Sequence, residues 1–126
     1  MRILLDTHIL IWHLEGDSQL SPDRRLLIAS PSNQVLISIA SLWEIAIKLS
    51  KGKLAISKSI NDVVEQVERS TGLIFAIEPE HLIHVASLPF HHKDPFDRLI
   101  IAQSLVENIP ILTADSNFSQ YGVELL

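Results

Sequence analysis

The stretch MRILLDTHILIW, residues 1–12, places an ionisable aspartate between two apolar segments. Residues 2–5 form a short apolar run typical of a buried strand. Residues 7–14 continue as an apolar segment compatible with a helix that Gly16 ends. Asp6 stands at the junction. A strand followed at once by a helix predicts an α/β fold, provided that the same alternation recurs along the chain.

The alternation does recur. Further strands are predicted at 35–38, 73–77 and 110–113, with 123–126 as a candidate fifth, and further helices at 21–30, 41–51, 59–70, 80–87 and from 94 onward. Alternating strands and helices imply parallel pairing through right-handed crossovers. The predicted fold is therefore α/β, a three-layer sandwich in which helices flank a central, mostly parallel sheet of about five strands. We expect residues 1–126 to form a single domain.

Composition narrows the class of protein. The chain has 126 residues, of which 47% are hydrophobic, so it can bury a core and is not a disordered chain. It has no cysteine, which excludes disulfides, a thiolate nucleophile and a cysteine-based zinc site. No uncharged apolar run approaches the roughly 20 residues of a membrane helix, and ionisable residues interrupt the region where a secretory signal would lie. We therefore expect a cytoplasmic protein that does not enter a membrane.

The net charge of −5 argues against a protein that holds nucleic acid by general neutralisation of phosphates. It remains compatible with an enzyme that acts on nucleic acid. Divalent cations can offset clustered carboxylates, and local lysines and arginines can hold a phosphate backbone.

Four acidic residues stand where predicted strands end or predicted helices begin. Asp6 and Asp115 follow strands directly, whereas Glu44 and Asp97 lie one turn into their helices, in SLWE and DPFD. In an open parallel sheet, ligands bind outside the carboxyl ends of the strands. We expect the four carboxylates to meet at this edge, provided that the helices of Glu44 and Asp97 begin there.

Each acid also has a local explanation. Asp6 could cap its helix, Glu44 could complete a capping box with the serine three residues before it, and Asp115 could belong to a turn. Asp97 could merely complement the helix dipole. Asp94 we interpret as a helix cap, because a proline follows it at the first helical position.

Taken together, the local explanations are weaker. Four carboxylates within about 5 Å would repel by roughly 3 kcal/mol per pair at an effective dielectric constant of about 20, so such a cluster needs a cation or shared protons. Oxygen ligands suit Mg²⁺ or Mn²⁺. One or two such ions can activate water and stabilise the leaving oxygen in phosphodiester hydrolysis. Asp6 and Asp97 would be inner ligands, with Glu44 and Asp115 completing the site or orienting water.

The stretches LLDTHILIW, SLWEIAIK, DPFDRLIIAQ and ILTADSNF, in this order, resemble the PIN domain, and most closely the VapC-type ribonuclease toxins of bacterial toxin–antitoxin pairs. The resemblance implies a parallel sheet of five strands between helices, Mg²⁺- or Mn²⁺-dependent endoribonuclease activity, a cognate antitoxin and a homodimer. The resemblance implies that the catalytic residues are Asp6, Glu44, Asp97 and Asp115. Among these, it implies Asp6, Asp97 and Asp115 as metal ligands, with Thr7 and Thr113 as supporting residues. Some relatives have another acid where this chain has Asn117, which leaves the second metal position open.

Several other polar residues have two interpretations. His8 follows the first junction acid closely and is interpreted as structural, with substrate contact as the alternative. His91 and His92 have no partner at ligand spacing and are predicted to lie in a solvated loop. Lys48 has the spacing of a helix ion pair with the junction glutamate. Contact with a phosphate is the alternative for Lys48 and for Arg98.

Two further questions stay open in the sequence. Trp12 and Trp43 are interpreted as core or helix-packing residues, with an aromatic groove for an antitoxin segment as the alternative. A receiver domain or a phosphatase also places acids at strand ends. However, a receiver would have a lysine after a late strand, and an aspartyl phosphatase a second aspartate where His8 stands. A non-catalytic interaction module would use the acids only as caps, and a metal titration would distinguish it.

Overall fold

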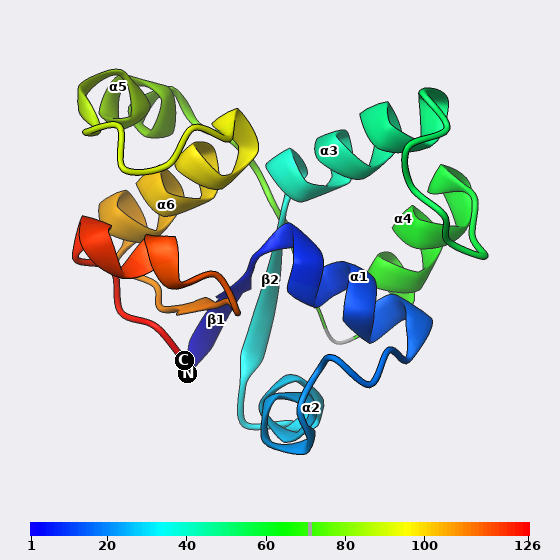
Figure 1. The fold of residues 1–126 in the computed structure, drawn as a ribbon. Helices are drawn as coiled ribbons and strands as arrows, with labels where there is room; N and C mark the ends of the chain where they lie inside the picture. Colours follow the sequence, from blue (N-terminus) through cyan, green and yellow to red (C-terminus); the bar gives the residue numbers. More distant parts are fainter. Residues whose placement is uncertain (71) are drawn as a thin grey trace.

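The sheet of this protein is entirely parallel. The computed structural model describes residues 1–70 and 72–126. Its four strands are β1 (Arg2–Leu5), β2 (Gln34–Ser38), β3 (Leu73–Phe75) and β4 (Ile111–Leu112), in the order β3-β2-β1-β4 (Figure 1). Central β1 pairs with β2 on one side and with β4 on the other. The predicted α/β class and parallel pairing are confirmed.

Helices cover both faces of the sheet. They are α1 (Thr7–Glu15), α2 (Pro22–Ala29), α3 (Ile39–Ser50), α4 (Ile60–Arg69), α5 (Pro79–Ser87), α6 (Pro95–Glu107) and the short 3₁₀ helix η1 (Ser116–Tyr121). Figure 1 shows α1, α3 and α4 to one side of the strands, and α5, α6 and η1 to the other. In the described part of the chain, no helix is both long and apolar enough to span a bilayer.

The two faces explain why residues 3–5 of β1 and 35–37 of β2 are all apolar. Ile3 and Leu5 point into one core together with residues of α1, α2, α3 and α4, whereas Leu4 points into a second core with residues of α6 and η1. Val35 and Leu36 of β2 divide between the two cores in the same way. A strand covered on both faces has no polar side, which is the usual condition of a parallel sheet in a three-layer sandwich.

The sheet has fewer strands than predicted. The candidate fifth strand at 123–126 forms a single bridge between Ile111 and Leu125. Two backbone hydrogen bonds accompany it, from Ile111 N to Glu124 O (2.9 Å) and from Leu126 N to Ile111 O (3.0 Å). The partner strand β4 is only two residues long and follows Pro110, which has no N–H to continue a ladder.

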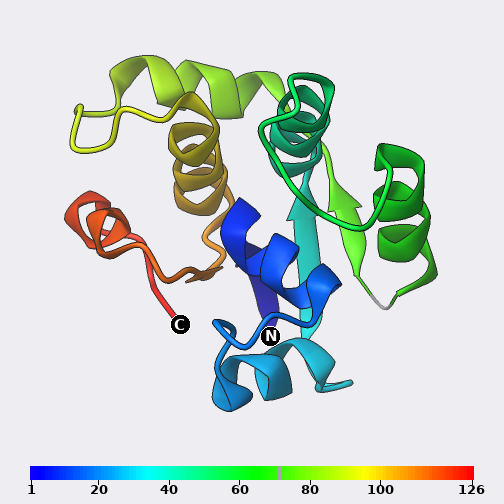
Figure 2. The same cartoon turned by 45° about the vertical axis from the view of Figure 1, so that its right-hand side comes forward.

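Helix α3 begins earlier than predicted, at Ile39 instead of 41. Its cap is Ser38, the last residue of β2, whose hydroxyl accepts from the N–H of Ala40 at 3.0 Å. No loop separates the strand from the helix, so α3 starts directly at the carboxyl edge of the sheet. Figure 1 and Figure 2 show the first turns of α1, α3 and α6 at this same end. The condition for Glu44 and Asp97 to reach the edge is therefore met.

Candidate functional site

Asp6 is buried where β1 ends, and it caps α1. Its Oδ1 accepts from the N–H of Ile9 at 2.8 Å, and the hydroxyl of Thr113 donates to its Oδ2. Burial raises the pKa of Asp6, while these two hydrogen bonds act in the opposite direction. The cap predicted from sequence is confirmed, and it fixes a buried carboxylate at the end of the central strand.

Thr113 connects the ends of β1 and β4. Its hydroxyl donates to Asp6 and accepts from the N–H of Asp115 at 3.0 Å. Asp115 is half-buried and caps η1 through the N–H of Asn117 at 2.9 Å. Burial acts to raise the pKa of Asp115, but the hydrogen bonds from Asn117 and His92 outweigh it, and the net shift is downward. The Asp115 carboxyl therefore ionises more readily than that of an aspartate in water.

Glu44 is buried on α3 and does not form the predicted capping box. That interpretation is wrong because α3 begins at Ile39, so that Ser41 lies within the helix. One oxygen of Glu44, Oε2, accepts from Lys48 Nζ at 2.6 Å, which confirms the predicted ion pair. The other oxygen, Oε1, is buried and has no hydrogen-bond partner among the described residues. Such an acceptor carries a full desolvation cost unless something binds it.

Asp97 is buried in the first turn of α6, beside the cap residue Asp94. Oδ1 of Asp94 accepts from the N–H of Phe96 at 2.8 Å and of Asp97 at 3.1 Å, as predicted for a helix cap. Burial, followed by the negative charge of Asp94, raises the pKa of Asp97 from 3.8 to about 7. The charges of Glu44 and Asp6 add to this rise. Asp97 thus experiences the other acids of the site.

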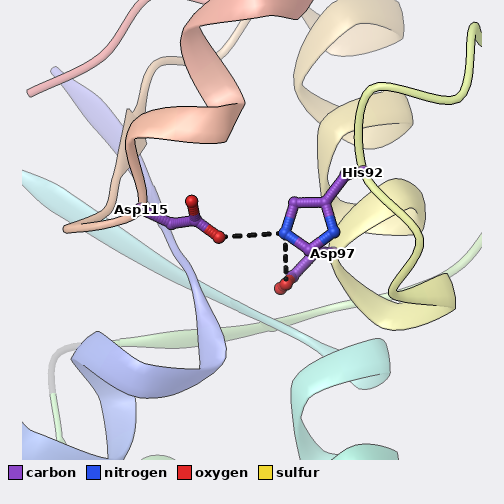
Figure 3. A group of neighbouring side chains, drawn as sticks. All are labelled: His92, Asp97 and Asp115. Atoms are coloured by element: carbon purple, nitrogen blue, oxygen red, sulfur yellow. Dashed lines mark hydrogen bonds and ion pairs between the residues drawn. The ribbon is translucent and has the colours of Figure 1, made fainter.

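His92 is a site residue that the sequence interpretation missed. Its Nε2 lies 3.1 Å from Asp97 Oδ2 and 2.9 Å from Asp115 Oδ2. Figure 3 shows the His92 ring in contact with both carboxylates. The prediction of a solvated loop was wrong for this residue, because its partners come from α6 and from the turn after β4. Both carboxylates were already candidates in the sequence. The available signal was a histidine two residues before the cap of a helix that carries one of them.

The described acids, together with one histidine, form two overlapping groups that could hold a cation. One consists of Glu44, Asp94 and Asp97, and the other of His92, Asp97 and Asp115, with ligand atoms within 4.8 Å of one another in each. Asp97 is common to both. Asp6 belongs to neither group, although its charge contributes to the raised pKa of Asp97. The structure thus places the predicted residues around Asp97 rather than in one compact cluster.

Thr7 and Arg98 support the site by holding neighbouring segments. The hydroxyl of Thr7 donates to Ser41 Oγ at 3.0 Å, which joins the first turns of α1 and α3. Arg98 is buried, donates to the backbone oxygens of Pro89 (2.8 Å) and Leu88 (3.2 Å), and its guanidinium lies over the ring of Phe90. Because these contacts use the Arg98 guanidinium in a structural role, they do not support the alternative in which it faces a phosphate.

The aromatic and imidazole side chains near the site differ in exposure. Trp12 is partly buried against the core, as predicted, and His8 is exposed with its ring 6.3 Å from that of Trp12. Trp43, predicted to be a core or helix-packing residue, is 55% exposed, and its ring meets the ring of Phe96 on α6 edge-on at 5.1 Å. It does not belong to a core, because α3 turns this side chain outward while it buries Glu44 at the next position, but it does pack against a neighbouring helix.

Solved structures share this fold. VapBC2 from Rickettsia felis, bound to a DNA fragment from its promoter, matches with a TM-score of 0.74 at 18% identity, covering 100% of this chain and 98% of that chain. VapBC-1 from nontypeable Haemophilus influenzae matches with a TM-score of 0.67 at 19% identity, covering 100% and 97%. A toxin–antitoxin complex from Klebsiella pneumoniae matches with a TM-score of 0.61 at 20% identity, covering 93% and 90%.

A comparison with family models gives a more specific result. No curated protein matches the chain. A family model described as the PIN domain, however, matches residues 3–124. This range contains β1 from Ile3 onward, the other described strands and helices, and the acids around Asp97. The chain therefore belongs to the PIN domain family.

Proposed function

We propose that residues 1–126 are one PIN domain that hydrolyses RNA internally with Mg²⁺ or Mn²⁺ and acts as the toxin of a toxin–antitoxin pair. PIN domains are generally nucleases. The observation that carries the proposal is the buried Oε1 of Glu44, which lacks a hydrogen-bond partner among the described residues, on a side chain whose carboxylate lies close to those of Asp94 and Asp97. A carboxylate that has a buried oxygen without a partner and lies close to two further carboxylates has the chemistry of a cation ligand.

The residues present fit a hard divalent cation. Glu44, Asp94 and Asp97 offer only oxygen, the ligand that Mg²⁺ and Mn²⁺ prefer. When bound, such an ion lowers the pKa of water and stabilises the leaving oxygen in phosphodiester hydrolysis. We assign Asp97 as the central ligand because both groups share it. Asp6, held by Thr113, and Asp115 complete the site or orient water.

The toxin part of the proposal rests on likeness. The solved structures named above that share this fold are VapBC proteins and a toxin–antitoxin complex. We propose that this chain likewise has a cognate antitoxin and forms a homodimer. Exposed apolar side chains supply surfaces that such partners would cover, among them Trp43, Leu82, Ile83 and Phe90. Its location in the cytoplasm stays a prediction.

The first test is cleavage of RNA. Purified protein should cut RNA internally with Mg²⁺ or Mn²⁺, and EDTA should stop the reaction. Asp97→Asn should lower the rate by about 100-fold or more, because the ion supplies several kcal/mol of transition-state stabilisation. Asp62→Asn is the matched control, since Asp62 is an exposed capping aspartate on α4. Equal rates for the wild type and Asp97→Asn would contradict the assignment of Asp97.

Thermal unfolding with and without Mn²⁺ provides a readout that does not depend on the RNA used. At a concentration about 100 times the dissociation constant, Mn²⁺ should stabilise the wild type by about 2.7 kcal/mol. It should do much less for Asp97→Asn. A wild type whose thermal stability does not change with millimolar Mn²⁺ would favour the interpretation as a non-catalytic interaction module.

Co-expression with the product of the adjacent gene tests the proposed antitoxin, and a stable complex is expected.

A further inference from the structure

His92 connects two segments that both supply carboxylates to the site. It precedes α6, which carries Asp97, and it faces the turn after β4, which carries Asp115. The two contacts differ little in length, 2.9 Å to Asp115 Oδ2 and 3.1 Å to Asp97 Oδ2, and both involve the same nitrogen, Nε2 (Figure 3). One imidazole N–H can therefore serve both carboxylates at once.

The other ring nitrogen shows which tautomer is present. The backbone N–H of Asp94 donates to Nδ1 of His92 at 3.1 Å. An atom that accepts a hydrogen bond from an N–H cannot carry a proton there itself, so the hydrogen-bond network assigns the proton of the neutral ring to Nε2. Nε2 is then a donor to Asp97 and Asp115.

The His92 ring is also fixed in position by groups other than the two carboxylates. Its backbone N–H donates to Tyr121 Oη at 2.7 Å, and the Tyr121 hydroxyl donates to the backbone oxygen of Pro89 at 2.9 Å. The ring meets the ring of Phe118 edge-on at 5.8 Å. Both aromatic residues belong to η1, the short helix that Asp115 caps. Residues of η1 thus hold the His92 ring in place, independently of its contacts with the two carboxylates.

We propose that His92 is a positioning residue: its Nε2–H holds the carboxylates of Asp97 and Asp115 at the spacing that a cation needs. This inference rests on the proposed function for the identity of the ion. His92 is not itself a ligand in this arrangement. Coordination through Nε2 would move the proton to Nδ1, where it would face the N–H of Asp94. The group of His92, Asp97 and Asp115 is therefore a hydrogen-bonded bridge beside the ion.

The first experiment measures Mn²⁺ binding by calorimetry at one neutral pH without RNA. His92→Leu should bind Mn²⁺ roughly 10- to 100-fold more weakly, the usual effect of losing a hydrogen-bond partner of metal ligands. His92→Gln, which keeps an N–H donor, should recover most of this loss. His91→Gln is the matched control, because exposed His91 contacts the Tyr121 ring rather than the carboxylates, and it should bind as the wild type does.

The second experiment observes the tautomer directly by ¹⁵N NMR of the metal-free wild type, so it does not depend on how the variants fold. The expected spectrum has a protonated Nε2 and an unprotonated Nδ1 for His92. The opposite tautomer, or a His92→Leu variant that binds Mn²⁺ as tightly as the wild type, would overturn the role of His92. Wild-type protein that binds no Mn²⁺ would instead overturn the proposed function.

Discussion

Helices α3 and α4 each carry a glutamate four residues before a basic residue, but the two ion pairs lie in different surroundings. On α3, Lys48 Nζ lies 2.6 Å from Glu44 Oε2, and the two side chains are 36% and 3% exposed. On α4, the corresponding pair of Arg69 and Glu65 is 3.6 Å apart, with 81% and 62% exposed. The spacing in the sequence is identical, so the difference comes from what packs around each helix.

Burial changes what an ion pair contributes. In water, an exposed pair at this spacing gains a few tenths of a kcal/mol. At a buried position, the acid has already lost its hydration, so that the basic partner offsets the much larger free energy of leaving a buried charge unpaired. Glu44 is in the second situation, and its Oε1 remains without a partner among the described residues. Glu65 is in the first. The comparison shows that the α3 pair holds a buried acid close to Asp94 and Asp97, whereas the α4 pair is a surface feature.

The same contrast holds for the capping aspartates. Asp62 on α4 completes a capping box with Ser59 in an exposed position. Asp94 is itself the N-cap of α6 and accepts from the N–H groups of its first turn, but it lies beside buried Asp97, whose pKa it helps to raise. The local geometry satisfies the backbone in both places. Only at the carboxyl edge of the sheet do the capping charges also act on one another.

The largest expected effect separates the two ion pairs. Lys48→Met should destabilise the fold by about 2 kcal/mol, because it leaves a buried carboxylate without its partner. Arg69→Met should cost less than about 0.5 kcal/mol, because both side chains are largely exposed. Urea unfolding of the two variants at neutral pH and low metal measures the difference. Equal costs would mean that burial of Glu44 does not matter.

An intermediate effect concerns the pH dependence of stability. The pKa of Asp97 is raised by burial to about 7, well above the value of about 3.9 in an unfolded chain. Between these values the folded protein keeps a proton that the unfolded chain releases. The contribution of Asp97 is therefore complete below pH about 4 and is lost as the pH rises through about 7.

Asp97→Asn removes this dependence. In metal-free protein above pH about 7, the variant should be more stable than the wild type by on the order of 1 kcal/mol, and the difference should disappear toward pH about 4. Unfolding curves across this range, with EDTA throughout, measure it. Asp62→Asn should follow the wild type at every pH. Parallel curves for Asp97→Asn and the wild type would show that neither burial nor the neighbouring charges raise the pKa of Asp97.

The smallest effect compares the two caps. Asparagine at 62 keeps a side-chain oxygen that can accept from the N–H of Ser59, so Asp62→Asn should change stability by no more than a few tenths of a kcal/mol. Asp94→Asn should keep its cap as well but relieve repulsion of Asp97, which gives a small net gain of similar size. Thermal melts in EDTA resolve the sign. A clear loss at Asp94 would mean that its charge stabilises the fold by contacts other than the cap.

Local chemistry made much of the structure predictable. Asp6 and Asp94 cap helices as predicted, Lys48 pairs with Glu44, and the first strand has the predicted bounds. These features depend on residues within four positions of one another. Two of the failures depend on distant segments. His92 was missed because its partner Asp115 lies 23 residues away, and Trp43 lies outside the core because of how α3 packs. The capping box at Glu44 failed locally, because Ser38 rather than Ser41 caps α3.

The sequence by itself determined the alternation of strands and helices, the parallel sheet and the position of Asp6 and Asp115 at its edge, because apolar periodicity, caps and breakers act over a few residues. Only the tertiary structure decided how the four acids are arranged around Asp97, which of the two ion pairs is buried and which ring nitrogen of His92 carries the proton. Burial and electrostatic coupling depend on distances in space between segments that meet only after folding. A pattern in one chain does not contain those distances.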